Sequence, residues 1–175
     1  MPIKLLIFLA SQGLNKKLAS RIAGHSDDCG FKSHTIDLVD LDAPLFSMKL
    51  HEQNGPPESI KNLASLMRSS GALVFVGPEY NGGLPPNLTN TFAWLSLCTF
   101  PEDKHGWRSC FINKPAFLAT HSSGVALKML SALRMQLAHM GVLVMARDLS
   151  VTLSQNLDQM ILENLTELHQ LAAKN

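Results

Sequence analysis

The sequence has few cysteines and no two of them close together. Its three cysteines, Cys29, Cys98 and Cys110, are an odd number at wide spacing. Disulfide frameworks use even numbers of cysteines and zinc sites use closely spaced pairs, so the pattern argues against both. Widely spaced free thiols are typical of a reducing compartment, and we therefore expect a cytoplasmic protein.

The sequence has no large excess of positive or negative charge, and it has no long apolar run. Its net charge is +1, and its largest cluster of basic residues is the pair Lys16-Lys17. Proteins that bind nucleic acid or anionic membranes carry a basic patch, so we expect neither partner. No run approaches the 18 or so apolar residues of a membrane helix. The start of the chain could be mistaken for a signal peptide, but Ser11-Gln12-Gly13 favours a strand that ends in a loop.

The composition is that of one compact unit. The chain has 175 residues, of which 46% are hydrophobic and 17% are charged, so disorder is not expected. We find no repeat and no composition shift that would mark a boundary, and we predict a single domain over residues 1–175.

Hydrophobic periodicity predicts alternating strands and helices. Short apolar runs predict strands at 3–9, 33–41, 72–77, 116–119 and 142–145. Apolar stripes at helical spacing follow them over 14–22, 60–67, 88–95, 126–140 and 157–172. The alternation predicts an α/β fold, a flavodoxin-like doubly wound sheet of five parallel strands in the order 2-1-3-4-5 with helices on both faces.

Three predicted loops should meet at one edge of this sheet. In a doubly wound sheet the ligand lies beyond the carboxyl ends of the strands, at the switch point between strands 1 and 3. The loops that converge there are 10–15, 78–86 and 120–125, and all are rich in Ser, Thr, Asn, Gly or Pro. This edge is the predicted binding surface.

The first of these loops, "ASQGLN", leads directly into a helix. Exposed amides at a helix start, with Ser11 and Asn15 nearby, form an anion site suited to a phosphate. Ser11 or Gly13 could instead merely cap the helix. The loop contains neither GxGxxG nor GxxxxGK[ST], so dinucleotide and P-loop fingerprints are absent from it.

The second loop lies within the stretch "VFVGPEYNGGLPPNLTN", residues 74–90. Seven of the ten residues at 77–86 are Gly, Pro or Asn, which predicts a fixed turn whose backbone can hold a flat heterocycle. Tyr80 is the only tyrosine of the chain and would lie at the rim of the site, or would pack beside Pro85-Pro86.

The stretch "PEYNGGLPPNLTNTFAWLS" resembles the PEYNGSxPxxLKNxxDWLS motif of the NAD(P)H-dependent FMN reductase family. That family has a flavodoxin-like fold and includes chromate and quinone reductases and azoreductase relatives. The segments "NKPAFLAT" and "ALRMQLAHMGV" resemble the family's KPxxxxxxS and LRxxLxxLG, so the resemblance covers essentially the whole chain. It implies a flavoprotein with FMN and NAD(P)H as cofactors.

The resemblance also implies which residues bind FMN. The PEYN turn would contact the flavin ring, the loop after strand 4 would approach it, and the loop after strand 1 would bind the phosphate. The residues so assigned are Pro78, Glu79, Tyr80, Asn81 and Gly82 for the turn, Ser122, Ser123 and Gly124 for the strand-4 loop, and Ser11 and Asn15 for the phosphate.

Two of these loops depart from the family pattern. The first loop is shorter than the family's GSxRxxSxN and lacks its arginine, and the loop after strand 4 lacks the paired glycines of SxGxxGGxRxQxxLR. In the helix after the turn, Thr89 and Ala93 replace the usual lysine and aspartate. Because charge-assisted contacts are the stronger ones, loss of the arginine should weaken FMN binding by about 1–3 kcal/mol.

The implied reaction passes hydride from NAD(P)H through the flavin to a small acceptor such as a quinone, free flavin, an azo compound or chromate. Such a reaction needs no side-chain nucleophile or general base, so we predict no catalytic residue and no metal. His121 adjoins Ser122 without a GxSxG elbow, and it would at most line the site.

The shortened loops keep an alternative open, a flavodoxin-like module that has lost FMN and acts as a non-catalytic binding or regulatory protein. A flavodoxin-type electron carrier is a weaker alternative, because the net charge is not strongly acidic. Family members pair through the helix after the PEYN turn, so we expect a homodimer or homotetramer. The side chains expected at that contact are Leu88, Phe92, Trp94 and Leu95.

Overall fold

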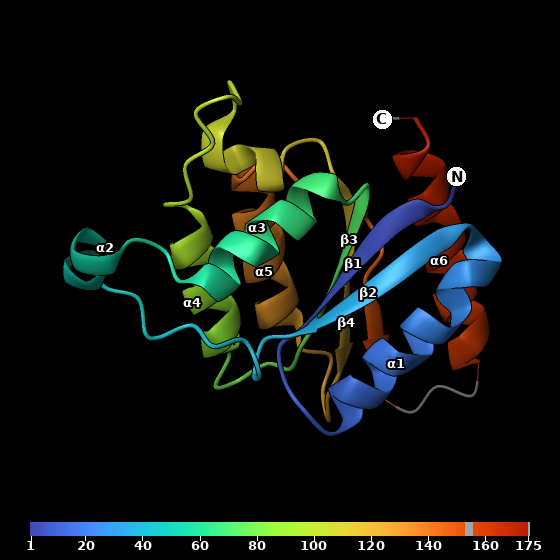
Figure 1. Cartoon of the computed structure of the whole chain (residues 1–175). Coiled ribbons are helices and arrows are strands. Elements are labelled where there is room, and N and C mark those ends of the chain that lie inside the picture. The colour runs from blue at the N-terminus through green and yellow to red at the C-terminus, as the bar shows by residue number, and fades with distance from the viewer. Residues whose placement is uncertain (153–155, 175) are drawn as a thin grey trace.

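A parallel sheet forms the centre of the protein in a computed structural model that describes residues 1–152 and 156–174 (Figure 1). Its strands are β1 (Ile3–Leu9), β2 (Phe31–Asp37), β3 (Ala72–Val76), β4 (Pro115–His121), β5 (Leu143–Val144) and β6 (Leu149–Val151). All neighbours are parallel, in the order β2-β1-β3-β4-β5, and β6 also pairs with β4. The predicted flavodoxin-like fold and strand order are confirmed.

Helices cover both faces of the sheet. The helices are α1 (Leu14–Ser26), α2 (Met48–Asn54), α3 (Glu58–Ser69), α4 (Pro86–Leu95), α5 (Leu127–His139) and α6 (Leu157–Ala172), with 3-10 turns at Asp27–Cys29 and Gly106–Cys110. Figure 1 shows α1 and α6 on one side of the sheet and α3, α4 and α5 on the other. Successive side chains of a buried strand point to opposite faces of the sheet, which explains this division. Ile7 of β1 packs in the hydrophobic cluster that contains residues of α1 and α6, and Phe8 packs in the cluster on the opposite face.

The second strand and the connection after it differ from the prediction. The strand was predicted at 33–41, but β2 pairs with β1 from Phe31 to Asp37. The connection predicted at 42–57 contains α2, which projects from the body of the molecule (Figure 1). Periodicity could not reveal α2, because none of its residues is buried and it therefore has no apolar stripe.

The fifth strand is interrupted. It was predicted at 142–145, but β5 covers two residues, and β6 continues the pairing further along β4. Arg134 of α5 occupies the interruption, where its guanidinium donates hydrogen bonds to the carbonyl oxygen of Met145 at 2.6 Å and to the carboxylate of Asp148. The chain resumes as β6 beside the end of β4, and Thr152 therefore reaches the carboxyl edge of the sheet.

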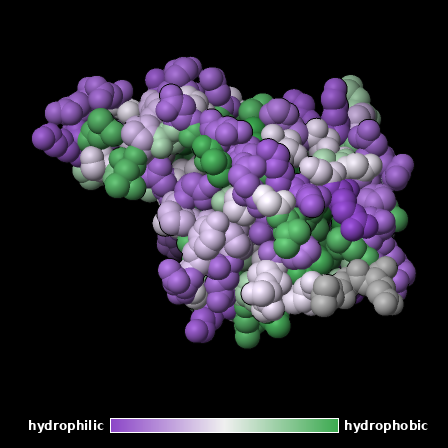
Figure 2. Space-filling model, turned by 90° about the horizontal axis from the view of Figure 1, so that it is seen from below, coloured by the Kyte–Doolittle hydropathy of each residue, from purple (hydrophilic) through white to green (hydrophobic). Residues whose placement is uncertain are grey.

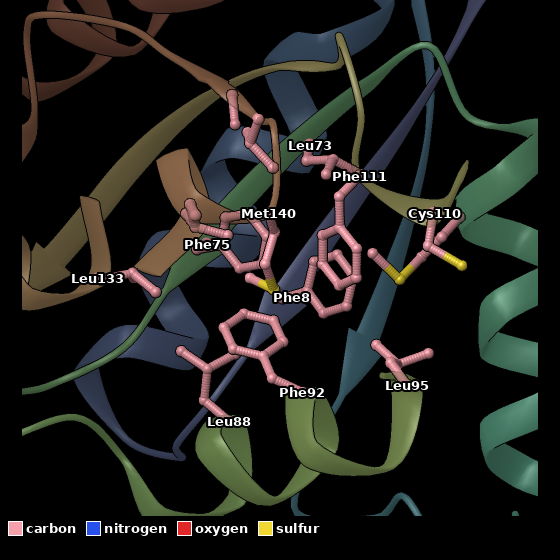
Figure 3. Packing of buried hydrophobic residues seen from close by; sticks show 14 of the residues in the cluster. Phe8, Leu73, Phe75, Leu88, Phe92, Leu95, Cys110, Phe111, Leu133 and Met140 are labelled. Atoms are coloured by element: carbon pink, nitrogen blue, oxygen red, sulfur yellow. The ribbon is translucent and has the colours of Figure 1, made fainter. Parts of the chain in front are cut away.

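The apolar side chains of α4 belong to the core of the same subunit. Leu88, Phe92, Trp94 and Leu95 are at most 3% exposed. Figure 3 shows Phe92 extending from α4 into this core, where its ring lies edge-on to that of Phe75 with centroids 5.8 Å apart. The expectation that these four side chains form a subunit contact is wrong, because they pack in the core cluster on the α4 face of the sheet, and Trp94 is covered by Pro44 and Phe46 of the 42–57 connection.

None of the helices within residues 1–152 and 156–174 is long and apolar enough to cross a membrane.

The three thiols should differ sharply in reactivity. Burial raises the pKa of Cys98 to about 11 and that of Cys110 to about 12, whereas Cys29 is partly exposed. Since the thiolate is the reactive form, a disulfide reagent at pH 8 should modify one thiol rapidly in the native protein and all three after unfolding. The released chromophore measures this, and Cys29→Ser should abolish the rapid phase. Rapid modification of more than one thiol would contradict the burial.

The same thiols predict a pH dependence of stability. The unfolded chain loses these protons near pH 9, while the native state holds them to about pH 11 or 12. The native state therefore binds more protons in this interval, and the free energy of unfolding should fall as the pH rises through it. Urea titrations between pH 8 and 11 measure the fall, which Cys98→Ala should reduce.

Candidate functional site

A cavity of about 640 Å³ opens where the carboxyl ends of β1, β3 and β4 meet. Its lining residues are Ser11, Gln12, Leu14, Asn15, Pro78, Tyr80, His121, Ser122, Ser123 and Thr152. The volume is within the range of small-molecule sites. Figure 2 views the molecule from below the orientation of Figure 1, and this face mixes hydrophilic and hydrophobic areas. The predicted switch-point location of a binding site is therefore matched by a cavity.

The cavity brings together six of the ten predicted site residues. Ser11, Asn15, Pro78, Tyr80, Ser122 and Ser123 line it. Glu79, Asn81, Gly82 and Gly124 belong to the same loops but do not line it.

The sequence prediction missed Gln12, Leu14 and Thr152 as lining residues. Thr152 was missed because the fifth strand was predicted to end at residue 145. The alternation of apolar and polar residues in "DLSVT", residues 148–152, was the available signal for β6.

Ser11 has a hydroxyl group for which the described part of the chain offers no hydrogen-bond partner. The residue is 7% exposed, and its Oγ is buried without a hydrogen-bond partner among the described residues. Helix α1 begins after Gly13, whose φ is 65°, and no side chain caps it. Ser11 is therefore not the cap, and Gly13, the other residue considered, occupies the N-cap position. A buried hydroxyl next to uncapped helical amides matches the donors that an anion requires.

Asn15 uses its side-chain amide to hold the end of β4. Its Nδ2 donates to the carbonyl oxygen of His121 at 3.1 Å, and its Oδ1 accepts from the amide of His121 at 2.9 Å. The residue is 5% exposed. Asn15 thus fixes the start of α1 against the loop that carries Ser122, and its direct contact with a phosphate stays a prediction.

Replacement Asn15→Asp should destabilise the protein even without any ligand. The carboxylate keeps the shape but turns the donor to the His121 carbonyl into an acceptor, so a buried carbonyl loses its partner. We expect the free energy of unfolding to fall by about 1–3 kcal/mol in urea titrations. The matched control Ser123→Ala changes an exposed side chain of the same cavity and should be nearly neutral. Equal free energies of unfolding for the two variants would show that the hydrogen bonds between Asn15 and the backbone of His121 contribute nothing to stability.

The stretch 80–83 forms a tight two-residue turn. The amide of Tyr80 donates to the carbonyl of Gly83 at 3.1 Å, and the amide of Gly83 donates back at 2.8 Å. Both central residues have positive φ, 51° at Asn81 and 76° at Gly82, as a type I′ Asn-Gly turn requires. Tyr80 is 49% exposed at the rim of the cavity, which favours the rim position over packing beside Pro85-Pro86.

Two further side chains connect the loops of the site. The Oε2 of Glu79 accepts a hydrogen bond from the amide of Met129 at 3.0 Å, in the first turn of α5. A carboxylate there satisfies a free helical amide and complements the helix dipole. The Nδ2 of Asn87 in α4 donates to the carbonyl of Ala10 at 3.0 Å. The backbone around the cavity is therefore held by polar contacts between elements that are distant in sequence.

The site is poor in positive charge. No lysine or arginine is among the lining residues, and Lys16 of α1 lies 3.6 Å from the carboxylate of Asp37. Within residues 1–152 and 156–174, no three His, Cys, Asp or Glu side chains are grouped so as to hold a metal ion. The arrangement offers hydroxyl groups, helical amides and a rigid turn, which suit a ligand with a phosphate and a flat ring.

Comparison with known sequences agrees with this geometry. The sequence model of the family described as NADPH-dependent FMN reductase matches residues 3–156. A quinone reductase of Escherichia coli (strain K12) is 32% identical over 84 residues, which are 48% of this chain and 40% of that protein. A quinone reductase of Pseudomonas putida is 27% identical over 117 residues, 66% of this chain and 56% of that protein. The chain spans about half the length of the curated relatives that it matches.

Comparison with solved structures supports the fold. FerB, a flavoenzyme NAD(P)H:(acceptor) oxidoreductase from Paracoccus denitrificans, superposes with a TM-score of 0.77 at 21% identity, over 98% of each chain. A flavodoxin from the domain Archaea superposes with a TM-score of 0.62 at 11% identity, over 97% of this chain and 98% of that one. At these identities the likeness concerns the fold alone.

Proposed function

The chain belongs to the NADPH-dependent FMN reductase family, and we propose that it is an NAD(P)H-dependent oxidoreductase that uses FMN to reduce a small molecule. The observation that carries the proposal is the cavity at the switch point, where the unpartnered Ser11 hydroxyl and the Tyr80–Gly83 turn lie at one edge of the sheet.

The residues of the cavity fit FMN. We infer that Ser11 and the start of α1 hold the phosphate, and that Pro78 and Tyr80 lie beside the ring, with Ser122 and Ser123 at its other border. When bound, FMN supplies the chemistry of accepting and donating hydride. The chain contributes the position of the ring and backbone donors held in place before binding, through the Asn15 and Glu79 contacts.

For the acceptor we propose a quinone. The support is that two relatives of this chain bear the name quinone reductase. Free flavin, azo compounds and chromate are the further acceptors that we expect the same site to serve. Acceptors of this kind are flat or small, so they could approach the flavin ring from the face that the protein leaves exposed.

Visible absorbance of the purified protein tests the proposal. FMN added in stoichiometric amount should bind and show shifted flavin bands, NADPH under anaerobic conditions should bleach them, and a p-benzoquinone should restore them. A protein that binds no FMN even in large excess would instead be the non-catalytic binding or regulatory module. A protein that binds FMN but whose flavin bands are not bleached by either NADPH or NADH would be a flavodoxin-type electron carrier.

Two other properties remain our expectations. We propose a homodimer or homotetramer, whose contact must use surfaces other than the four buried α4 side chains. We also propose a cytoplasmic location, which rests on the free state of Cys29, Cys98 and Cys110.

A further inference from the structure

Among the described residues that line the cavity, His121 is the single one whose side chain can become positively charged near neutral pH. The other nine lining residues are serines, a threonine, amides, an aliphatic residue, a proline and a tyrosine. The first loop lacks the arginine of the family pattern, so a phosphate bound in this cavity would have no permanently charged cation among the lining residues. An imidazole gains its charge between pH 8 and 5, so this position can supply one conditionally.

The position of His121 places it toward the phosphate end of the cavity. Along β4, Phe117 and Ala119 pack into the cluster on the α1 side of the sheet, and strand alternation assigns His121 to the same face. The backbone of His121 is held by Asn15 in the first turn of α1, next to the unpartnered hydroxyl of Ser11. The backbone of His121 is therefore tied to the start of α1, and both His121 and Ser11 line the cavity.

The other charged groups around this corner have partners or lie elsewhere. On α1, the ammonium of Lys16 pairs with Asp37. On the turn, the carboxylate of Glu79 accepts from the amide of Met129, and on α5 the side chain of Lys128 lies against Gly82.

Lys17, also on α1, is exposed and does not line the cavity. Val151 in β6 and Thr152 after it have no ionisable side chain, and the phenol of Tyr80 lies at the rim of the cavity.

We propose that protonated His121 supplies the positive charge that holds the cofactor phosphate, so that the affinity of the protein for FMN depends on pH. The proposal rests on the proposed FMN function and adds a condition to it. Cofactor loading would be favoured in mildly acidic solution and weakened above neutrality. The phosphate of FMN also titrates near pH 6, so the effect of the histidine is seen in the ratio between wild type and a His121 variant at each pH.

Dissociation constants measured by quenching of flavin fluorescence between pH 5.5 and 8.5 test this. The variants are His121→Gln, Lys16→Gln to test a permanent cation of α1, and His34→Gln as a control at an exposed histidine of β2. Each is titrated with FMN and with riboflavin, which lacks the phosphate. We expect His121→Gln to weaken FMN binding about tenfold at pH 6 and less than threefold at pH 8.5, with riboflavin unaffected.

A second measurement does not depend on the variant folding. Calorimetry of FMN binding to the wild type at pH 7, in buffers of different ionisation enthalpy, should show proton uptake that exceeds the uptake with riboflavin. Absence of that excess would overturn the proposal. So would a His121→Gln effect equal for FMN and riboflavin or constant with pH, or a loss in Lys16→Gln instead. Failure of every variant and of the wild type to bind FMN at any pH would overturn the proposed function as well.

Discussion

Replacement Trp94→Ala should lower the free energy of unfolding by about 3–5 kcal/mol, enough to threaten the folded state of an ordinary domain. Trp94 is fully buried, its Nε1 donates to the carbonyl of Pro44 at 2.7 Å, and its ring meets that of Phe46 edge-on with centroids 5.2 Å apart. The change therefore opens a cavity and removes one of the two donors to the Pro44 carbonyl, while Asn90 of α4 still holds that carbonyl at 3.0 Å. Urea unfolding followed by far-ultraviolet circular dichroism measures it.

Two controls separate burial from an interface role. Trp94→Phe keeps most of the ring and loses the hydrogen bond, so about 1–2 kcal/mol should be lost. Met135→Ala removes a side chain on α5 that is 69% exposed, and it should be nearly neutral. If Trp94→Ala left stability unchanged but split an oligomer in sedimentation velocity, α4 would be a subunit contact after all.

Replacement Gly82→Val should weaken FMN binding far more than it lowers stability, by at least about a hundredfold, or about 2.7 kcal/mol, against about 1 kcal/mol of the free energy of unfolding. Gly82 has φ of 76°, which a β-branched residue strongly disfavours, and an added Cβ would lie 3.3 Å from Cδ of Lys128. The turn can relieve the strain by changing its shape at the surface, but the ring then loses the backbone against which it docks. Flavin fluorescence and urea titration of the same samples compare the two effects.

The neighbouring glycine provides the control. An added Cβ at Gly83 would be 3.5 Å from the carbonyl oxygen of Tyr80, an ordinary contact, and the residue does not have positive φ. Gly83→Ala should therefore retain most of the affinity for FMN. If Gly82→Val lost stability to the same extent as affinity, the glycine would serve folding alone.

Local sequence pattern predicted the strands and helices that have a buried face. It found β1 and β3 nearly to the residue, because a strand buried on both faces is a continuous apolar run. It missed α2, which buries no residue, and the interruption of the fifth strand, where a side chain from α5 replaces strand pairing. The resemblance to the family, and not the local pattern, assigned the α4 side chains to a subunit contact, and periodicity could not correct it because it shows that a face is apolar but not what covers that face.

The sequence by itself determined the order of the elements, and with it the sheet and the edge where three loops converge. This was possible because the spacing of apolar residues and the presence of turn residues determine secondary structure locally. Only the tertiary structure decided which polar groups of that edge are free to bind. The side chain of Asn15 is hydrogen-bonded to the backbone of His121, 106 residues away, and that of Glu79 to the amide of Met129, 50 residues away. The hydroxyl of Ser11 has no such partner among the described residues. Such pairings depend on how distant segments pack, and no local pattern records them.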